Sequence, residues 1–274
     1  MEWFPSFEKG YARLEQEGSP WCVVNLLAVV QWMRESLYVP VLISVVYAVT
    51  IFGLQRYMRT KEPFSLRRPL ILWNAFLALY SIIAAVSTVP TFIYDIYSLG
   101  FLGELCMSST EGYMTPWYIV FAFSKILELV DTLFIVLRKR PLIFLHWYHH
   151  IATLIFCWEC VGLGTSTGTW FMAMNLVVHS IMYSYYCLSA MGYRFSQVSR
   201  LSITCLQILQ MLMGITVITS QILYCPYYPE RNTYTGLLMY LSYAILFIRF
   251  FVSNLFGSKR QHQPSSVPPK KKEA

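Results

Sequence analysis

The sequence predicts an all-α integral membrane protein with seven transmembrane helices, and its composition and the lengths of its apolar runs support this prediction. Of the 274 residues, 56% are hydrophobic and 13% are charged, whereas a soluble domain carries about 25% charged residues. A spanning helix needs about 20 mostly apolar residues, and seven stretches within one membrane domain, residues 37–256, meet this requirement. They are residues 37–55, 69–94, 114–137, 141–163, 168–190, 200–225 and 233–256.

The loops between these segments carry Lys and Arg unevenly, which predicts the orientation of the chain. Fifteen of the 21 Lys and Arg residues lie on one side of the membrane, in the connections around residues 56–68, 138–140 and 194–200 and in the tail. Because Lys and Arg are enriched in cytosolic loops, seven spans place the N-terminus outside the cytosol and the C-terminus inside it. The net charge of +7 follows from this topology and indicates no nucleic-acid partner.

The first third of the chain carries little candidate chemistry. We expect residues 1–36 to be an amphipathic, aromatic-containing segment that is lumenal or lies at the interface. Segments 37–55 and 69–94 have almost no ionisable residues, so we expect them to be a scaffold that faces lipid. Pro90 predicts a kink or an early exit near the end of the second segment, because proline interrupts the hydrogen bonds of a helix.

The third segment, residues 114–137, is the first that carries several ionisable side chains. Lys125, Glu128, Asp131 and Thr132 are spaced so that they share one sector of a helix. Charged groups within a membrane are costly, so they should pair with one another or with neighbouring polar groups. Two interpretations stay open: an ion-pair cluster that only holds helices together, or a site in which the lysine binds an anionic group and the carboxylates orient histidines.

Three of the five histidines lie together in the fourth segment. His146, His149 and His150 stand at positions i, i+3 and i+4, which share one face of a helix. An imidazole in hydrocarbon is unfavourable without a hydrogen-bond partner, so the face should point into the protein or a wet cavity. A structural network is the alternative, but three histidines on one face favour a functional site.

The later segments repeat this pattern of inward polar stripes. Four successive helices would then surround a chemically equipped interior, which suits a long lipid-like substrate with one reactive end. Arg249, near the end of the seventh segment, either snorkels to the interface or lines the cavity. The stripes consist of Asn175, His179, Met182, Tyr183 and Tyr186 on the fifth segment and Thr204, Gln207 and Gln210 on the sixth.

The cysteines divide into two groups by their predicted depth. Cys106 lies between the second and third segments and Cys225 at the end of the sixth, so both fall on the non-cytosolic side, where disulfides can form. Cys157 and Cys160 have CxxC spacing within a predicted membrane helix. Because redox and zinc motifs need accessible thiolates, we interpret this second pair as packing residues.

The polar motifs, in their order and spacing, resemble the signature set of the very-long-chain fatty acid elongases. The resemblance covers about residues 35–256 and rests on Lys125-x-x-Glu128-x-x-Asp131-Thr132, His146-x-x-His149-His150, Asn175-x-x-x-His179-x-x-Met182-Tyr183-x-Tyr185-Tyr186 and Thr204-x-x-Gln207-x-x-Gln210. It implies a fold in which six of the seven helices form a closed bundle around an acyl-CoA cavity. Trp147 and Tyr148 lie between the first two histidines, and this pair resembles that of the family branch that acts on saturated and monounsaturated chains.

This resemblance implies a condensing enzyme, a 3-oxoacyl-CoA synthase. Such an enzyme joins a long-chain acyl-CoA to malonyl-CoA and releases carbon dioxide and CoA, without a metal or a further cofactor. Separate reductases and a dehydratase would complete the cycle, because the chain has no Gly-rich nucleotide-binding motif. A homo-oligomer is left open.

The resemblance also implies roles for single residues. His149 would be the nucleophile that carries the acyl group, since an acyl-imidazole is reactive enough to pass its acyl group on. His146 and His150 would orient it or stabilise an oxyanion, and His179 would assist. A ternary complex, in which the histidines act only as bases or donors, stays open. The substrate-binding residues would be Lys125, Asn175, Tyr183, Tyr186, Gln207 and Gln210, and the supporting residues Glu128, Asp131 and Thr132, the two acids by accepting N–H bonds from histidines.

Two further expectations concern covalent linkage and cellular address. Relatives have cysteines in places similar to Cys106 and Cys225, which implies a disulfide between them. In the basic cytosolic tail, residues 257–274, Lys271 and Lys272 stand fourth and third from the end and resemble the dilysine signal that returns membrane proteins to the endoplasmic reticulum. The alternative is a basic tail held by anionic lipid.

Two other protein classes compete with this interpretation. A membrane di-iron desaturase or hydroxylase also uses histidine boxes, but such sites take on the order of eight imidazole ligands, and the chain has four histidines outside the tail. A seven-helix receptor or transporter fits the number of spans. The three consecutive segments rich in ionisable residues and the short loops argue against it.

Overall fold

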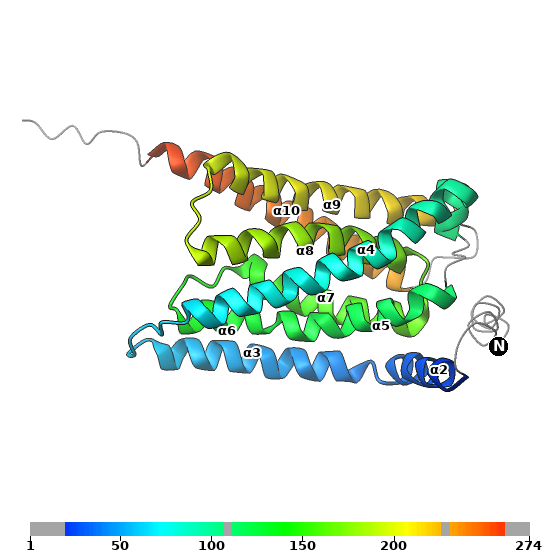
Figure 1. Cartoon of the computed structure of the whole chain (residues 1–274), viewed down its shortest axis with the longest axis horizontal. Coiled ribbons are helices and arrows are strands. Elements are labelled where there is room, and N and C mark those ends of the chain that lie inside the picture. The colour runs from blue at the N-terminus through cyan, green and yellow to red at the C-terminus, as the bar shows by residue number, and fades with distance from the viewer. Residues whose placement is uncertain (1–19, 107–110, 226–230, 261–274) are drawn as a thin grey trace, which may run out of the picture.

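The computed structural model describes residues 20–106, 111–225 and 231–260, and the regular elements in these ranges are helices (Figure 1). Most of them run roughly along the long axis of the molecule, with short connections at the two ends. The helices are α2 (Pro20–Glu35), α3 (Tyr38–Met58), α4 (Arg67–Cys106), α5 (Glu111–Glu128), α6 (Val130–Leu137), α7 (Phe144–Leu163), α8 (Thr167–Met191), α9 (Gln197–Tyr224) and α10 (Arg231–Arg260).

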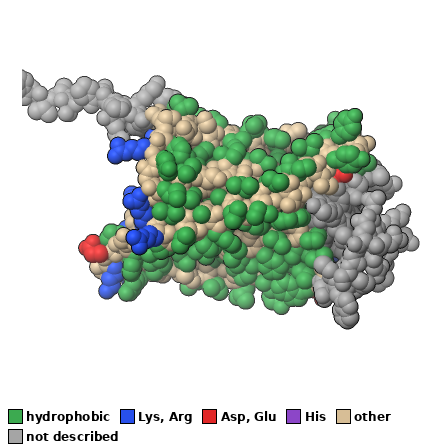
Figure 2. All heavy atoms as spheres, viewed as in Figure 1, with side chains coloured by type: hydrophobic (Ala, Val, Ile, Leu, Met, Phe, Trp, Pro, Cys, Tyr) green, Lys and Arg blue, Asp and Glu red, His purple; other side chains and the backbone are tan. Residues whose placement is uncertain are grey.

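Length and composition make this an integral membrane protein. Four of the described helices are long and apolar enough to cross a bilayer: α3, α4, α9 and residues 232–255 of α10. Figure 2 shows apolar side chains spread over the flank, whereas Lys and Arg gather at the end that carries the α3–α4 and α6–α7 connections. The other predicted spans lie in α5 to α8, and the third of them is divided between the shorter helices α5 and α6.

The second predicted segment is longer than the sequence suggested, and its break is in a different place. The α4 helix continues through Pro90 to Cys106, so of the two outcomes expected near Pro90, a kink or an early exit, the exit was wrong. The backbone leaves helical angles at Gly100, with φ 72° and ψ 168°. Glycine adopts such angles without the steric penalty of a Cβ atom, so the sharp change of direction falls there.

The third predicted segment is divided at Leu129 into α5 and α6. Around it the backbone bonds span three residues, from Leu129 N to Ile126 O at 3.2 Å and from Thr132 N to Leu129 O at 3.2 Å. This tightening resembles a 3₁₀ turn, which inside a helix often marks a functional position. It changes the direction of the side chains that follow.

The helices pack as neighbours that the chain order does not reveal. α4 packs along α8, α9 packs on α8 and α10, and α7 packs on α5 and α10. α3 lies at the edge of the molecule and contacts α6 and α7 (Figure 1). α2, within the N-terminal segment, packs against α7, where the buried Trp158 donates a hydrogen bond to the carbonyl of Met33 at 3.0 Å.

Candidate active site in a histidine-lined cavity

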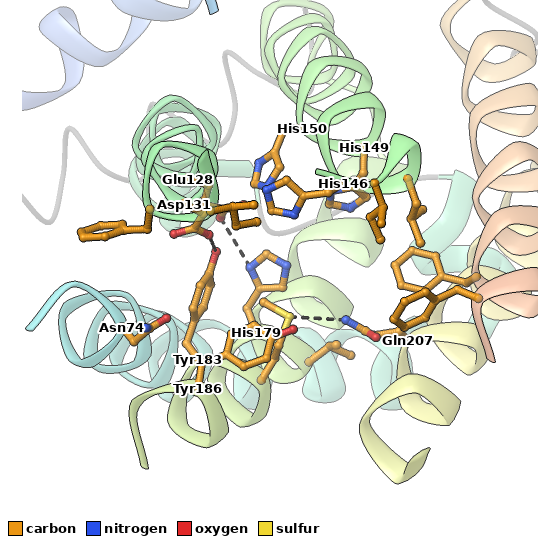
Figure 3. Close-up of a pocket in the computed structure, with 18 of the residues that line it drawn as sticks. Asn74, Glu128, Asp131, His146, His149, His150, His179, Tyr183, Tyr186 and Gln207 are labelled. Atoms are coloured by element: carbon orange, nitrogen blue, oxygen red, sulfur yellow. Dashed lines mark hydrogen bonds and ion pairs between the residues drawn. The ribbon is translucent and has the colours of Figure 1, made fainter. Parts of the chain in front are cut away.

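A cavity of about 480 Å³ lies inside the molecule, and residues of every helix from α4 to α10 line it. Four histidines take part in this lining: His146, His149 and His150 from α7 and His179 from α8. Figure 3 shows His179 projecting toward the three histidines of α7. The structure therefore brings together the two histidine motifs that the sequence places about 30 residues apart.

The three histidines of α7 share one face, as their spacing predicts. The ring centroids of His146 and His150 are 4.5 Å apart, and those of His149 and His150 are 5.7 Å apart. Tyr243 of α10 packs its ring against His149, with centroids at 4.9 Å, and donates a hydrogen bond to the His149 carbonyl at 3.1 Å. Tyr243 thereby holds the backbone of the histidine motif in place.

A buried polar network fixes His179 from behind. Lys125 Nζ donates to Glu128 Oε1 at 2.6 Å and to Asn175 Oδ1 at 2.7 Å. The amide of Asn175 is oriented by this bond, so its Nδ2 donates to His179 Nε2 at 3.2 Å. His179 then carries its hydrogen on Nδ1, which lies 3.4 Å from Glu128 Oε1. This contact is compatible with the role predicted for Glu128, which is to orient a histidine.

The structure gives Lys125 and Asp131 different surroundings from those predicted. Lys125 is 2% exposed and is not among the residues that line the cavity, because its ammonium group is occupied by Glu128 and Asn175. Asp131 lines the cavity but accepts its hydrogen bonds from Trp73 Nε1 at 2.6 Å and Tyr183 Oη at 2.7 Å, not from a histidine. The turn at Leu129 separates the two side chains.

Thr132, the last residue of the same motif, points to a third set of neighbours. Its Oγ1 lies 2.6 Å from Tyr47 Oη of α3 and 2.9 Å from His146 Nε2 of α7. The predicted single sector is therefore split: Glu128 faces α8, Asp131 faces α4 and α8, and Thr132 faces α3 and α7. The tyrosine of α3 had been expected only in a lipid-facing scaffold.

The remaining predicted polar residues lie where their helix stripes place them except Thr204, which is buried but does not line the cavity. Asn175, Tyr183, Tyr186, Gln207 and Gln210 line the cavity, and Gln207 Nε2 lies 3.3 Å from the Met182 sulfur. Arg249 is exposed and lies outside the lining, in agreement with the snorkelling alternative.

Some residues that line the cavity were not predicted from the sequence. Asn74 of α4 lines the cavity, and Arg138 and Arg140 line it at the end that bears the basic side chains. The two arginines also border an adjoining hollow of about 510 Å³ with residues 63–67. The sequence had used these arginines only to predict orientation, because loop charge does not say which loop lies next to a cavity.

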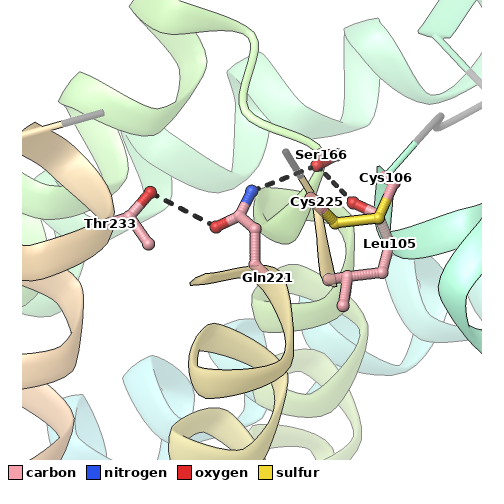
Figure 4. The surroundings of a disulfide bond; sticks show 6 residues. All are labelled: Leu105, Cys106, Ser166, Gln221, Cys225 and Thr233. Atoms are coloured by element: carbon pink, nitrogen blue, oxygen red, sulfur yellow. Dashed lines mark hydrogen bonds between the residues drawn. A yellow bond between two sulfur atoms is a disulfide. The ribbon is translucent and has the colours of Figure 1, made fainter. Parts of the chain in front are cut away.

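The expected disulfide is present (Figure 4). It lies where α4 and α9 end, at the opposite end of the molecule from the α3–α4 connection (Figure 1). Cys106 of α4 and Cys225 at the end of α9 are bonded, with their Cα atoms 5.4 Å apart. Beside them Ser166 donates to the Leu105 carbonyl at 2.7 Å and Gln221 donates to Ser166 at 3.5 Å. Cys157 and Cys160 are free and buried in the core, in line with their interpretation as packing residues.

Fold and site together define a class: an all-helical integral membrane protein whose interior holds a histidine-lined polar cavity. Within the described residues, no group of three or more His, Cys, Asp or Glu side chains is placed to hold a metal ion. The side chains that line the cavity carry imidazole, amide, phenol, carboxylate and guanidinium groups.

Comparison with known proteins identifies the family. A family model described as ELO: GNS1/SUR4 family matches residues 32–263. Over 243 residues the chain is 40% identical to very long chain fatty acid elongase 6 from Homo sapiens, which covers 85% of this chain and 90% of that protein. It is 38% identical over 239 residues to long chain fatty acid elongase 1 from Caenorhabditis elegans, with coverage of 83% and 82%.

The chain therefore belongs to the ELO: GNS1/SUR4 family of fatty acid elongases. It is a condensing enzyme, a 3-oxoacyl-CoA synthase that acts on acyl-CoA and malonyl-CoA. The resemblance found in the sequence motifs is confirmed.

Proposed function

We propose that condensation takes place in the histidine-lined cavity and that His149 carries the acyl group as an acyl-imidazole. One observation carries this assignment. Among the described residues, the His146 and His179 rings are hydrogen-bonded to other side chains, whereas the ring of the cavity-lining His149 has only ring contacts with Tyr243, His150 and Phe247. Its neighbour His150 is buried, while His149 is partly exposed. His149 is thus the accessible imidazole with nitrogens left for a substrate.

The chemistry proceeds in two stages. A nitrogen of His149 attacks the thioester carbonyl, the carbon–sulfur bond breaks, and CoA leaves with the proton lost by the imidazole. Malonyl-CoA then loses carbon dioxide, and the resulting enolate attacks the acyl carbon. A carbon–carbon bond forms as the carbon–nitrogen bond breaks, and the departing imidazole nitrogen takes up one proton, the proton that the overall condensation consumes, which restores His149. Amide and imidazole donors around the cavity stabilise the negative charge on oxygen, and exclusion of water protects the acyl-enzyme.

The test uses acyl-CoA without malonyl-CoA. The covalent route releases CoA in an amount equal to the enzyme and leaves an acyl adduct on the peptide that spans residues 141–160. The His149→Ala variant should give neither. Normal condensation without free CoA or an adduct in the first step would disprove the acyl-histidine route and support the ternary complex.

The two ends of the cavity suit the two ends of the substrate. Arg138 and Arg140 at the basic end can bind the phosphates of CoA, because guanidinium groups recognise phosphate well. The thioester would then reach the histidines, and the acyl chain would extend into the apolar interior.

We further propose a preference for saturated and monounsaturated chains. Trp147 and Tyr148, on which this rests, do not line the cavity but pack α7 against Phe52 of α3 and bond to Ser242 of α10. Product profiles with a series of acyl-CoA lengths test this preference.

We propose that seven segments span the membrane of the endoplasmic reticulum, with α4 to α10 enclosing the cavity and α3 outside. The basic end would be cytosolic. Lys271 and Lys272, the proposed retrieval signal, lie outside the described residues. Glycosylation reporters at both termini test the orientation, and replacement of both lysines with Ser tests the signal.

Reductases and a dehydratase would act on the product. The mass of the purified particle would test whether the enzyme associates with itself.

A further inference from the structure

Tyr47 of α3 reaches the active site through a single intermediate. α3 supplies no side chain to the cavity lining, yet the Tyr47 hydroxyl lies 2.6 Å from Thr132 Oγ1, and Thr132 Oγ1 lies 2.9 Å from His146 Nε2. Tyr47 is 6% exposed and Thr132 is fully buried. The three groups form a hydrogen-bonded chain from α3 through α6 to α7.

The number of hydrogens fixes the direction of this chain. The Thr132 hydroxyl has one hydrogen, so it donates to one neighbour and accepts from the other. In the part of the chain that the structure describes, Thr132 is the one hydrogen-bond partner of the Tyr47 hydroxyl. If Thr132 donated to Tyr47, the tyrosine O–H would be buried without an acceptor, which is unfavourable. Tyr47 therefore donates to Thr132, and Thr132 donates to His146 Nε2.

We infer that Tyr47 is a positioning residue that, through Thr132, holds His146 in the tautomer with hydrogen on Nδ1, so that His146 acts in condensation as a hydrogen-bond donor. An imidazole whose Nε2 accepts a hydrogen bond carries its hydrogen on Nδ1. His146 lines the cavity, so this N–H is the group it can offer to an oxygen that becomes negative, either of the thioester or of the enolate.

This inference rests on the proposed placement of the reaction in the cavity and narrows the role of His146. Between orienting His149 and stabilising an oxyanion, it assigns the second. It also explains why α3, outside the ring of helices that line the cavity, packs against both α6 and α7. The hydroxyl that sets the tautomer comes from a helix that supplies no residue to the cavity lining.

The test compares kcat and KM of full-length purified enzymes for both CoA substrates. Tyr47→Phe removes only the donor oxygen and should lower kcat about three- to tenfold, with KM changed less than about twofold. Thr132→Val should lower kcat at least as much. The double variant should be no slower than Thr132→Val alone, because Tyr47 acts only through Thr132. Thr132→Ser, which keeps the hydroxyl, should recover most of the rate lost in Thr132→Val.

The matched control is Tyr57→Phe, which removes a hydroxyl from the same helix at a side chain that is 60% exposed; it should match the parent. Rates are normalised to the folded enzyme in the gel-filtration peak. If Tyr47 had only a general packing role, its variants would lower the yield of folded enzyme and Thr132→Ser would not recover the rate. The losses in kcat of the two single variants would then multiply in the double variant. That pattern would overturn the inference.

Two histidine variants separate this inference from the proposed function. If His149→Ala is inactive but Tyr47→Phe has the parent kcat, the role of Tyr47 is disproved and the catalytic cavity stands. The same holds if His146→Ala keeps the parent rate. If His149→Ala itself keeps the parent rate, the proposed mechanism fails independently of Tyr47.

Discussion

The Lys125 ammonium and the Glu128 carboxylate form an ion pair of 2.6 Å whose side chains are 2% and 4% exposed. Two buried charges are tolerable because each one compensates the other and Asn175 and His179 take up further hydrogen-bonding capacity. Removal of one partner leaves the other charged and buried. Lys125 therefore orients Asn175 directly and His179 through Asn175, from the side away from the cavity. These contacts favour the ion-pair interpretation of Lys125 over direct substrate binding.

Replacement of Lys125 tests this difference. Lys125→Met should destabilise the enzyme strongly, by about 3–5 kcal/mol, because it leaves the Glu128 carboxylate unpaired. The double variant Lys125→Met/Glu128→Gln should recover part of this loss. The measurement is the thermal unfolding temperature in one detergent. Lys61→Met, at an exposed lysine, is the control and should change stability by less than about 0.5 kcal/mol. Parent stability of Lys125→Met with a raised KM for malonyl-CoA would instead support substrate binding.

The same motif shows how far periodicity predicts a site. The spacing of Lys125, Glu128, Asp131 and Thr132 identified residues that all belong to the polar interior. Three of them contact an amide or a histidine there, and Asp131 contacts Trp73 and Tyr183. Their shared direction failed because the helix tightens at Leu129. A prediction based on a regular period of 3.6 residues per turn assumes an uninterrupted helix, so it cannot anticipate such a local change. The partners Trp73 and Tyr47 were missed because aromatic residues in apolar segments are ordinarily core or lipid contacts.

Helix packing in this molecule depends on close approach at a few positions. On α9, Gly214 lies directly against the ring of Tyr240 from α10, so that a Cβ atom at Gly214 would overlap that ring. The ring of Tyr240 packs in turn on Phe171 of α8, with centroids at 4.9 Å. The glycine lets α8, α9 and α10 share one aromatic contact close to the core.

A single methyl group tests that contact. Gly214→Ala should lower stability by about 1–3 kcal/mol, because the ring of Tyr240 must move within a packed core. Gly53→Ala on α3 is the matched control: nothing lies within 4 Å of its added Cβ, so stability should stay the same or rise by up to about 1 kcal/mol. Adding Tyr240→Leu to Gly214→Ala should restore part of the loss. Unfolding temperatures that are equal for the two alanine variants would contradict the packing argument.

Apolar run length predicted where helices occur, since a bilayer admits few other structures, but not always where they end. α4 continues past residue 94 although Asp95 and Glu104 follow. Both are buried, and Thr169 of α8 donates to Glu104 at 3.1 Å. A hydropathy pattern ends the predicted span before these carboxyl groups. In the structure, α4 packs along α8, which allows the carboxyl groups to be buried within the helix pair. Packing partners of this kind are not visible in a single sequence.

At the scale of the whole molecule, the two ends differ in chemistry. Basic loops surround one end, where Arg138 and Arg140 border the cavity, and the Cys106–Cys225 disulfide lies at the other. Loop charge predicted this polarity, and the motifs predicted the histidine-lined interior. The lateral order of the helices, such as α4 beside α8, could not be predicted, because hydropathy specifies depth in a membrane and not which helices are neighbours.

The disulfide offers a test of how the molecule is held together away from its chemistry. It links residues 119 positions apart, and in the chain-entropy model a closed loop of this size stabilises by about 4–5 kcal/mol. Because the bond joins α4 to the end of α9 and none of its neighbours lines the histidine cavity, its loss should lower stability more than activity. Cys106→Ser and Cys225→Ser should each lower the unfolding temperature by several degrees, and the double variant should fall no further than either single one. All three should keep their kcat at low temperature.

Cys205→Ser, at an exposed free cysteine, is the control. Mass spectrometry of non-reduced peptides should find residues 106 and 225 linked in the parent; free thiols there, or unfolding temperatures equal to the control, would show that the two helix ends are held by packing alone.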